Sequence, residues 1–264
     1  MPKISGARHL HELYGTTNRR HHFPEAQWRH LILAARNTAA AFDTIHQANI
    51  IIGNVKQGNL LVDHRMVVRL IDCDSFQITH QDQLFFCPVG TPHFTPPELQ
   101  SIKLREVPRT IDHDHFGLAI LIFHLLFIGR HPFVGRYRGS GDLPIEKAIA
   151  EHRFAFSKDI STTRLDPPPA SLRLEDLPHS FDNLFERAFR HDPSDGNRRP
   201  TARQWIEQLE LLMKARKHCR FDPAHVYFRQ LSNCPWCRVE DEGGPSFLCK
   251  LGALPTFSRN GSSH

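Results

Sequence analysis

The feature that most constrains the fold is a polar loop followed by a predicted β-hairpin and an aspartate. Residues Ile52 to Asn59 read Ile-Gly-Asn-Val-Lys-Gln-Gly-Asn, and Asp72 follows thirteen residues after Asn59. Between them, Leu60 to Val62 and Met66 to Ile71 are apolar runs typical of short paired strands. Such a hairpin places Asn59 and Asp72 at neighbouring strand ends. Two oxygen ligands in that position suit Mg²⁺, which keeps several waters and binds few protein groups.

Four further motifs follow the hairpin. Residues 90–98 read Gly-Thr-Pro-His-Phe-Thr-Pro-Pro-Glu, and residues 112–117 read Asp-His-Asp-His-Phe-Gly at the start of an apolar stretch. Residues 129–133 read Gly-Arg-His-Pro-Phe, and residues 199–202 read Arg-Pro-Thr-Ala. Each polar residue alone has an ordinary explanation, because an isolated Asn is usually a turn residue and a lone Asp a cap. Five motifs in one order require a common cause.

In this order the motifs resemble the C-lobe of a protein kinase. Their wording is similar to bacterial kinase-like proteins described as helix-hairpin-helix DNA-binding proteins with a kinase domain, and the resemblance extends from Met1 to about Cys237. It implies a protein-kinase-like α+β fold, with a mainly α-helical C-lobe and a short β-hairpin in residues 1–213. The apolar residues between Pro24 and Gln47 recur at helical spacing and predict the first long helix.

The resemblance also implies an activity, the transfer of the γ-phosphate of ATP to a protein Ser or Thr hydroxyl with Mg²⁺ as cofactor. Asn59 and Asp72 would hold the metal and the nucleotide, and Lys56 would face the transferred phosphate. A lysine at that place favours Ser/Thr over Tyr as the acceptor. Three further residues would be structural, the first two as a buried bidentate ion pair: Glu98, Arg199 and Asp112.

Two departures from the family's pattern lower the expected activity. Asn54 stands where the family has the aspartate that accepts the proton of the attacking hydroxyl. An amide orients a hydroxyl but does not take its proton, and loss of a general base costs roughly 10²–10⁴-fold in rate. In addition, no Gly-rich loop or Val-Ala-Ile-Lys-like strand precedes Asn54, and Met1 to Ile4 resembles the hinge between two lobes. The sequence therefore predicts a C-lobe without its N-lobe, with weak or no phosphotransfer.

The C-terminal part predicts a second metal site. Cys234-Pro-Trp-Cys237 is a C-x₂-C knuckle, whose spacing lets two thiolates share one tetrahedral Zn²⁺. In a cytosolic chain, C-x-x-C indicates metal or redox chemistry rather than a structural disulfide. Cys219 and His225 would complete a Cys₃His site, a choice that the resemblance supports. Competing ligands are His218 and Cys249, and free thiols or a redox pair stay open as alternatives. This zinc-knuckle-like extension is placed at residues 214–250, before a disordered tail at 251–264.

The composition of the chain constrains its class, compartment and partners only weakly. The chain is 40% hydrophobic and 23% charged, as in an ordinary soluble globule. No secretory signal is visible. The apolar stretch Phe116 to Ile128 is shorter than the ~20 residues that span a bilayer, so it predicts a buried helix. The cytoplasm is the expected compartment, without a membrane partner. The net charge of +5 favours anions only weakly, because the basic residues are scattered and not interleaved with aromatics as in a nucleic-acid groove.

Three functional hypotheses follow. The first is a Ser/Thr protein kinase of weak or absent activity, favoured by Lys56, Asn59 and Asp72. The second is a pseudokinase or regulatory scaffold that binds a partner protein, favoured by Asn54 and the missing N-lobe. The third is a zinc-dependent nucleic-acid-binding module. The expected partner is a protein substrate or a regulatory protein, and the resemblance suggests a metal-dependent protein phosphatase.

Overall fold

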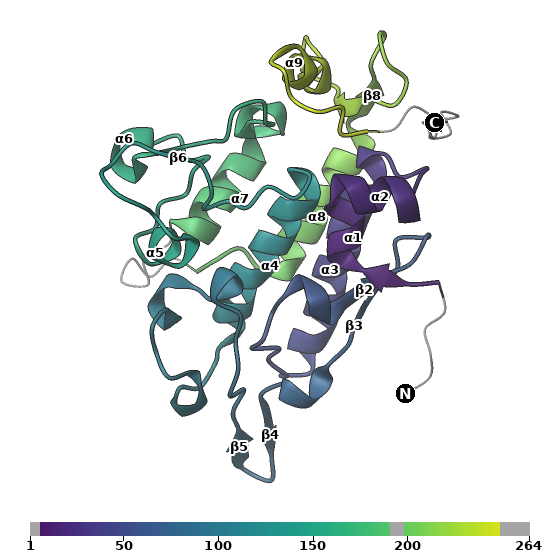
Figure 1. The fold of residues 1–264 in the computed structure, drawn as a ribbon. Coiled ribbons are helices and arrows are strands. Elements are labelled where there is room, and N and C mark those ends of the chain that lie inside the picture. The colour runs from purple at the N-terminus through teal and green to yellow at the C-terminus, as the bar shows by residue number, and fades with distance from the viewer. Residues whose placement is uncertain (1–5, 191–197, 249–264) are drawn as a thin grey trace, which may run out of the picture.

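The computed structural model describes residues 6–190 and 198–248. The predicted hinge at Met1 to Ile4, the candidate ligand Cys249 and the predicted tail at 251–264 lie outside these described residues. Figure 1 shows a helical body whose centre is formed by three long helices, with short strand pairs at its margins. The three are α3 (Trp28–Gln47), α4 (Ile111–Leu126) and α8 (Ala202–Lys214), and α3 packs against both of the others.

The sequence explains why these three helices form the centre. Helix α3 buries one face, including Leu31, Ala35 and Phe42, as expected from their helical spacing. Helix α4 is buried all round from Asp114 to Leu126, which fits its continuous apolar sequence. The side-chain oxygen of Thr110 accepts a hydrogen bond from the backbone N–H of His113 and so caps the start of α4.

The remaining helices surround this centre. They are α1 (Leu10–Tyr14), α2 (Thr16–His22), α5 (Ile145–Ala150), α6 (Ile160–Thr163), α7 (His179–Phe189) and α9 (Pro235–Asp241). Phenylalanine rings join α4 to α7 and to the intervening loops; Phe123, for example, lies edge-on to Phe185 with ring centroids 5.1 Å apart. Within residues 6–190 and 198–248, no helix combines the length and the apolar character that crossing a membrane requires.

The predicted hairpin is present and belongs to a three-stranded antiparallel sheet. Strand β2 (Leu60–Val62) lies between β1 (Arg8–His9) and β3 (Val68–Leu70), with Leu60 opposite Leu70. The second strand begins later than predicted because Met66 has a left-handed backbone, with φ of 60°, and belongs to the turn. The Asp63 carboxylate closes this turn by accepting hydrogen bonds from the N–H groups of Arg65 and Val67.

Three more strand pairs lie elsewhere in the described residues. Strand β4 (Ile78–His80) pairs with β5 (Gln83–Phe85) in the hairpin that projects at the bottom of Figure 1. Strands β6 (Arg136–Tyr137) and β7 (Leu165–Asp166) join two loops. Strands β8 (Arg216–His218) and β9 (Val226–Phe228), together with α9, form a C-terminal extension. The extension packs on the body through Trp236, whose ring lies edge-on to Trp28 at 5.7 Å.

Candidate active site and metal centre

The polar loop Ile52 to Asn59 is held in place by a carboxylate of the central helix. Asp114, which is 1% exposed in α4, accepts hydrogen bonds of 2.8 Å from the backbone N–H groups of Ile52 and Gly53. Its Oδ2 also lies 3.0 Å from Nε2 of His46 at the end of α3. A buried carboxylate with three donors is satisfied, so these bonds fix the loop to the core.

Asp114 was not predicted as a site residue, and Asp112 was the aspartate predicted from this motif. The signal was present, because Asp114-His-Phe-Gly-Leu-Ala matches the family's Asp-x-Trp-Ser-x-Gly when the motif is read two residues later. Asp112 instead bonds Arg199: its Oδ2 lies 2.7 Å from Nη1, and its Oδ1 accepts a hydrogen bond from the Arg199 N–H.

Close packing between the loop and α4 supports the same anchor. A Cβ added at Gly117 of α4 would lie 2.7 Å from Cβ of Val55 in the loop. Gly53 has φ of +69°, a left-handed backbone that favours glycine, and a Cβ there would lie 2.6 Å from Cβ of Cys87. Both positions therefore need glycine for the loop to reach its place.

Asn54 is oriented within the site by its neighbours. Its side chain is buried, and Oδ1 accepts a hydrogen bond of 3.2 Å from the Thr91 hydroxyl. The amide of Asn59 donates to the backbone oxygen of Asn54 over 3.3 Å, which links the two ends of the loop. Thr91 was not predicted as a site residue, although it lies inside the motif at 90–98.

Lys56 and Asp72 face each other at the exposed edge of the site. Lys56 Nζ lies 4.0 Å from Asp72 Oδ2, and the side chains are 35% and 48% exposed. The hairpin brings Asp72 beside Asn59, because the N–H of Ile71 donates to the Asn59 carbonyl over 2.9 Å. Asp72 has φ of 62°, a left-handed conformation that is uncommon for a residue other than glycine and that clusters at functional sites.

These residues fit a hydrated Mg²⁺. The Asn59 side-chain nitrogen donates a hydrogen bond to the Asn54 carbonyl, so Oδ1 of Asn59 is directed away from that bond. The Asp72 carboxylate is half-exposed and has the Lys56 ammonium at 4.0 Å. One amide oxygen and one carboxylate at adjacent strand ends are a donor set that Mg²⁺ accepts, with waters filling the other positions.

The predicted ion pair between Glu98 and Arg199 is present. Arg199 is 1% exposed, and its Nη1 and Nη2 donate to Oε1 and Oε2 of Glu98 over 2.7 and 2.8 Å. Burial opposes the charged form of Glu98, but the Arg199 hydrogen bonds and charge outweigh it, so the pKa of Glu98 is lowered. The pKa of Asp112 is lowered against burial in the same way, by the nearby His115 ring, whose Nδ1 lies 4.0 Å from Oδ1 of Asp112, and by the Arg199 charge. The cluster ties the segment after the loop to α4 and to the start of α8.

Four side chains of the C-terminal extension converge, and they are the four predicted from the sequence. The ligand atoms of Cys219, His225, Cys234 and Cys237 all lie within 4.8 Å of one another. Sγ of Cys219 and Sγ of Cys237 are 3.6 Å apart, and Nδ1 of His225 lies 3.5 and 3.7 Å from Sγ of Cys237 and Cys234. A tetrahedral ion with Zn–S of ~2.3 Å and Zn–N of ~2.0 Å would separate its ligand atoms by about 3.5 to 3.8 Å. The three separations given above fall in this range, so the size of the group suits a zinc ion.

The surroundings of this group fit the same ion. Nε2 of His225 lies 3.4 Å from Oε1 of Glu240, so a carboxylate orients the ring from behind, as in many zinc sites. The N–H of Phe221 donates to the Cys219 sulfur. Glu240 was not predicted, because its distance in sequence from His225 gives no sign of the contact. Of the competing ligands, His218 is not a member of the group that the described residues form.

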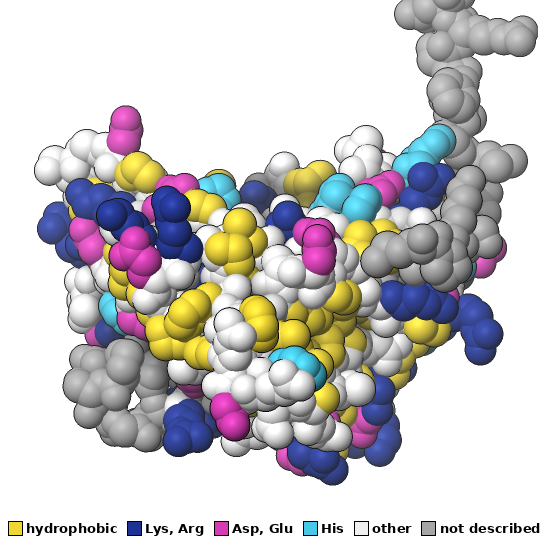
Figure 2. All heavy atoms as spheres, turned by 90° about the horizontal axis from the view of Figure 1, so that it is seen from below, with side chains coloured by type: hydrophobic (Ala, Val, Ile, Leu, Met, Phe, Trp, Pro, Cys, Tyr) yellow, Lys and Arg dark blue, Asp and Glu magenta, His cyan; other side chains and the backbone are white. Residues whose placement is uncertain are grey.

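An apolar face lies beside the loop. Figure 2 views the molecule from the end that carries β4 and β5, and shows hydrophobic side chains gathered over the middle of that face. Exposed hydrophobic residues of the hairpin and the segments after it are Ile78, Leu84, Phe85, Phe86, Val89 and Ile102. A cluster of this kind is typical of a surface that contacts another molecule.

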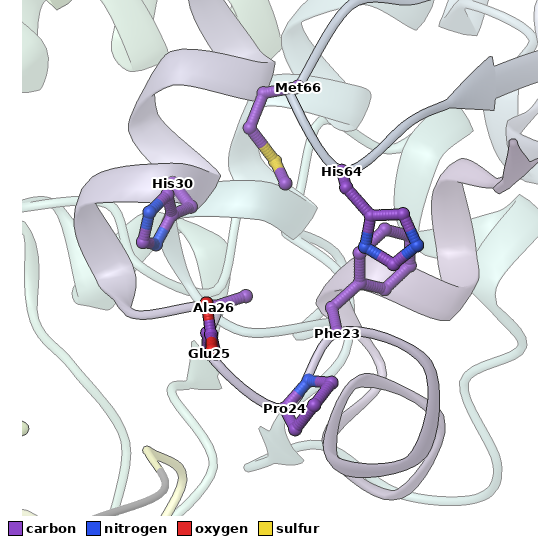
Figure 3. Close-up of a pocket in the computed structure, with 7 residues that line it drawn as sticks. All are labelled: Phe23, Pro24, Glu25, Ala26, His30, His64 and Met66. Atoms are coloured by element: carbon purple, nitrogen blue, oxygen red, sulfur yellow. The ribbon is translucent and has the colours of Figure 1, made fainter. Parts of the chain in front are cut away.

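A separate hollow of about 210 Å³ lies between the start of α3 and the turn after β2 (Figure 3). His30 and His64 line it from these two elements, with Phe23, Glu25 and Met66. Burial, followed by the charge of Arg29, lowers the pKa of His30. This mixture of one carboxylate, two imidazoles and apolar groups does not indicate a particular ligand.

Comparison with known proteins agrees with the geometry. The chain belongs to the protein kinase family, because the family model of the protein kinase domain matches residues 5–209. Over 251 residues, 94% of this chain, it is 41% identical to protein kinase YegI of Escherichia coli O157:H7 and 40% identical to protein kinase YegI of Escherichia coli strain K12. Over 95 residues, 36% of this chain, it is 33% identical to a cGMP-dependent protein kinase of Drosophila melanogaster, isozyme 2 forms cD5/T2, of which it covers 10%. The chain spans 38% of the length of the two Escherichia coli relatives.

Proposed function

We propose that this chain carries the phosphotransfer site of a Ser/Thr protein kinase, with slow turnover. The observation that carries the proposal is the anchored loop: Asp114 fixes its backbone, Thr91 orients Asn54, and Lys56 lies 4.0 Å from Asp72. Asn59 and Asp72 would hold Mg²⁺ with ATP, and the bound ion would neutralise charge on the phosphates. The two Escherichia coli relatives, which are longer than this chain and are named protein kinase, support the same activity.

The side chains divide the work as follows. Lys56 places a positive charge where a transferred phosphate would lie next to Asp72. Asn54, held by Thr91, positions the acceptor hydroxyl but has no lone pair basic enough to take its proton. Transfer therefore relies on positioning and electrostatics without a general base, and the rate is low.

The test is a phosphotransfer assay with ATP and Mg²⁺ on the purified chain and on Asn54→Asp, which keeps the shape of the side chain. We expect Asn54→Asp to raise the rate by roughly 10²–10⁴-fold, and Asp72→Asn in that background to remove the gain. A thermal-shift titration with ATP and Mg²⁺ measures binding separately. If neither protein transfers phosphate, the enzymatic proposal fails for this chain.

A regulatory scaffold is the second candidate, favoured by the apolar face of Figure 2 and by Asn54. Its partner would be a protein substrate or a regulatory protein, and a metal-dependent protein phosphatase is the one to test first. The double substitution Phe85→Ser and Phe86→Ser should weaken association in analytical ultracentrifugation. The matched control, Leu211→Ser, changes an exposed leucine of α8. Equal affinity in both variants would exclude this face.

For the extension, we propose a structural Zn²⁺ held by Cys219, His225, Cys234 and Cys237. The proposal is supported by the closeness of the four ligand atoms, three of whose separations are 3.5 to 3.7 Å, and by Glu240 behind His225. Because metal binding adds to folding free energy, a strong chelator should lower the melting temperature, and Cys237→Ser should do the same. Metal analysis should find one zinc per chain. A protein that contains no metal and whose melting temperature is the same with and without the chelator would contradict the site.

A further inference from the structure

A basic hollow lies at the end of the body where α8 runs into β8, near the top of Figure 1. Its volume is about 190 Å³, and it also borders the start of α3. Five of its seven lining residues are basic, and none is acidic: Arg29, Lys214, Arg216, Lys217 and His218, with Met213 and Val226.

The charges of this hollow are held close together without a carboxylate among them. Burial, followed by the positive charge of Arg29, lowers the pKa of the Arg216 guanidinium. The positive charges of Arg29 and Arg216 also lower the pKa of the neighbouring His30, to which burial contributes most. Among the described residues, no ion pair neutralises Arg29, Lys214 or Arg216. Like charges kept in one place are costly unless an anion joins them.

Two of the cations are positioned in advance. Arg216 Nε donates to the Met213 carbonyl over 2.5 Å. Lys217 Nζ donates to the Leu231 carbonyl over 2.7 Å and lies 5.1 Å above the Tyr227 ring. Arg29 and Lys214 are exposed and stand at the rim. The Lys217 ammonium is therefore held at Leu231 and Tyr227, while Arg216 is held by a backbone carbonyl beside the two exposed cations of the rim. The hollow combines one fixed cation with long side chains able to close over a ligand.

We propose that this hollow binds a phosphomonoester, namely the phosphorylated Ser or Thr side chain of a peptide. Such a group concentrates a charge of about −1.5 to −2 and three acceptor oxygens at one point, which matches the several basic residues that line this one small hollow. A nucleic acid would instead need basic groups that follow a backbone with one charge per ~1.7 Å of duplex.

The choice of a phosphorylated Ser or Thr rests on the proposed function, because that residue is the product of a Ser/Thr kinase. The site itself does not depend on turnover. It lies at the opposite end of the body from the β4–β5 hairpin in Figure 1, so it would retain a phosphorylated segment and take no part in phosphate transfer.

The test uses a short fluorescent phosphoserine peptide, its unphosphorylated twin, and a single-stranded oligonucleotide, with the purified chain and fluorescence anisotropy. Arg29→Gln removes a rim cation, and Arg203→Gln, an exposed arginine of α8 outside the hollow, is the control with the same charge change. We expect the phosphopeptide alone to bind, about tenfold or more weakly in Arg29→Gln, and unchanged in Arg203→Gln.

Two results would overturn the proposal. One is equal affinity for the two peptides, or for the two variants. The other is preferential binding of the oligonucleotide, which would assign the basic surface to nucleic acid. The peptide is phosphorylated beforehand, so its binding does not require turnover. If the chain is inactive in phosphotransfer but still binds the phosphopeptide, the proposed function is refuted while the proposed ligand of the hollow is supported.

Discussion

The protein should lose much of its stability between pH 7 and pH 5, because one buried and one half-buried imidazole, those of His124 and His131, are held in the neutral form. His124 lies near the end of α4, where its ring stacks on Tyr14 at 4.9 Å, and Nδ1 has no hydrogen-bond partner within the described part of the chain. His131 lies beyond the end of α4, and the centroid of its ring is 5.4 Å from that of His124 and 5.9 Å from that of His93.

The magnitude follows from the pKa values in the folded state. Burial lowers the pKa of His124 to about 4, and burial together with the neighbouring His124 lowers the pKa of His131 to about 3. In the unfolded chain these histidines take up protons near pH 6.5. Below that pH the unfolded state therefore binds more protons than the folded state, and the free energy of unfolding falls as the pH falls. Each histidine then costs about 2 kcal/mol between pH 7 and pH 5, and the pair about 4 kcal/mol. That is a large part of the ~5–15 kcal/mol typical of a domain.

The assay is urea unfolding at pH 7, 6 and 5, followed by tryptophan fluorescence. His124→Phe keeps an aromatic ring beside Tyr14 but removes the titrating group, so the loss between pH 7 and 5 should shrink by about 2 kcal/mol. The matched control is His80→Phe on the exposed strand β4, where the full pH dependence should persist. A wild-type protein equally stable at both pH values, or an unchanged slope in His124→Phe, would refute the reasoning.

Three further substitutions test the anchors of the site. Arg199→Gln leaves the Glu98 carboxylate without its bidentate partner and should lower the free energy of unfolding by about 3–5 kcal/mol in urea titrations; a loss below 1 kcal/mol would contradict a buried pair. Gly117→Ala places a Cβ against Val55 and should cost about 1–3 kcal/mol by the same measurement. Thr91→Val removes one hydrogen bond and should cost only about 1 kcal/mol, while reducing any phosphotransfer measured with labelled ATP.

The sequence predicted those parts of the fold whose signals are local. Helical spacing predicted α3, a continuous apolar run predicted α4, and two short apolar runs predicted β2 and β3. The strand β1 was not predicted, because two residues carry no periodicity and are fixed only by pairing with β2.

The missed site residues depend on geometry that spacing does not contain. Asp112 and Asp114 are two positions apart at the start of α4, so they point to nearly opposite sides of the helix, and the sequence alone does not say which side faces the loop. The basic hollow joins Arg29 to residues 214–218, which are far apart in sequence and meet only because α3 packs on α8.

The contact between Trp28 and Trp236 supplies an optical signal of its own. The chain has three tryptophans, and two of them form this edge-on pair, one on the helical body and one in the extension. Indole chromophores at 5.7 Å couple their electronic transitions, so near-ultraviolet circular dichroism should contain a component that vanishes when the extension detaches. Undocking could thus be followed in unlabelled protein, separately from the melting of the helices.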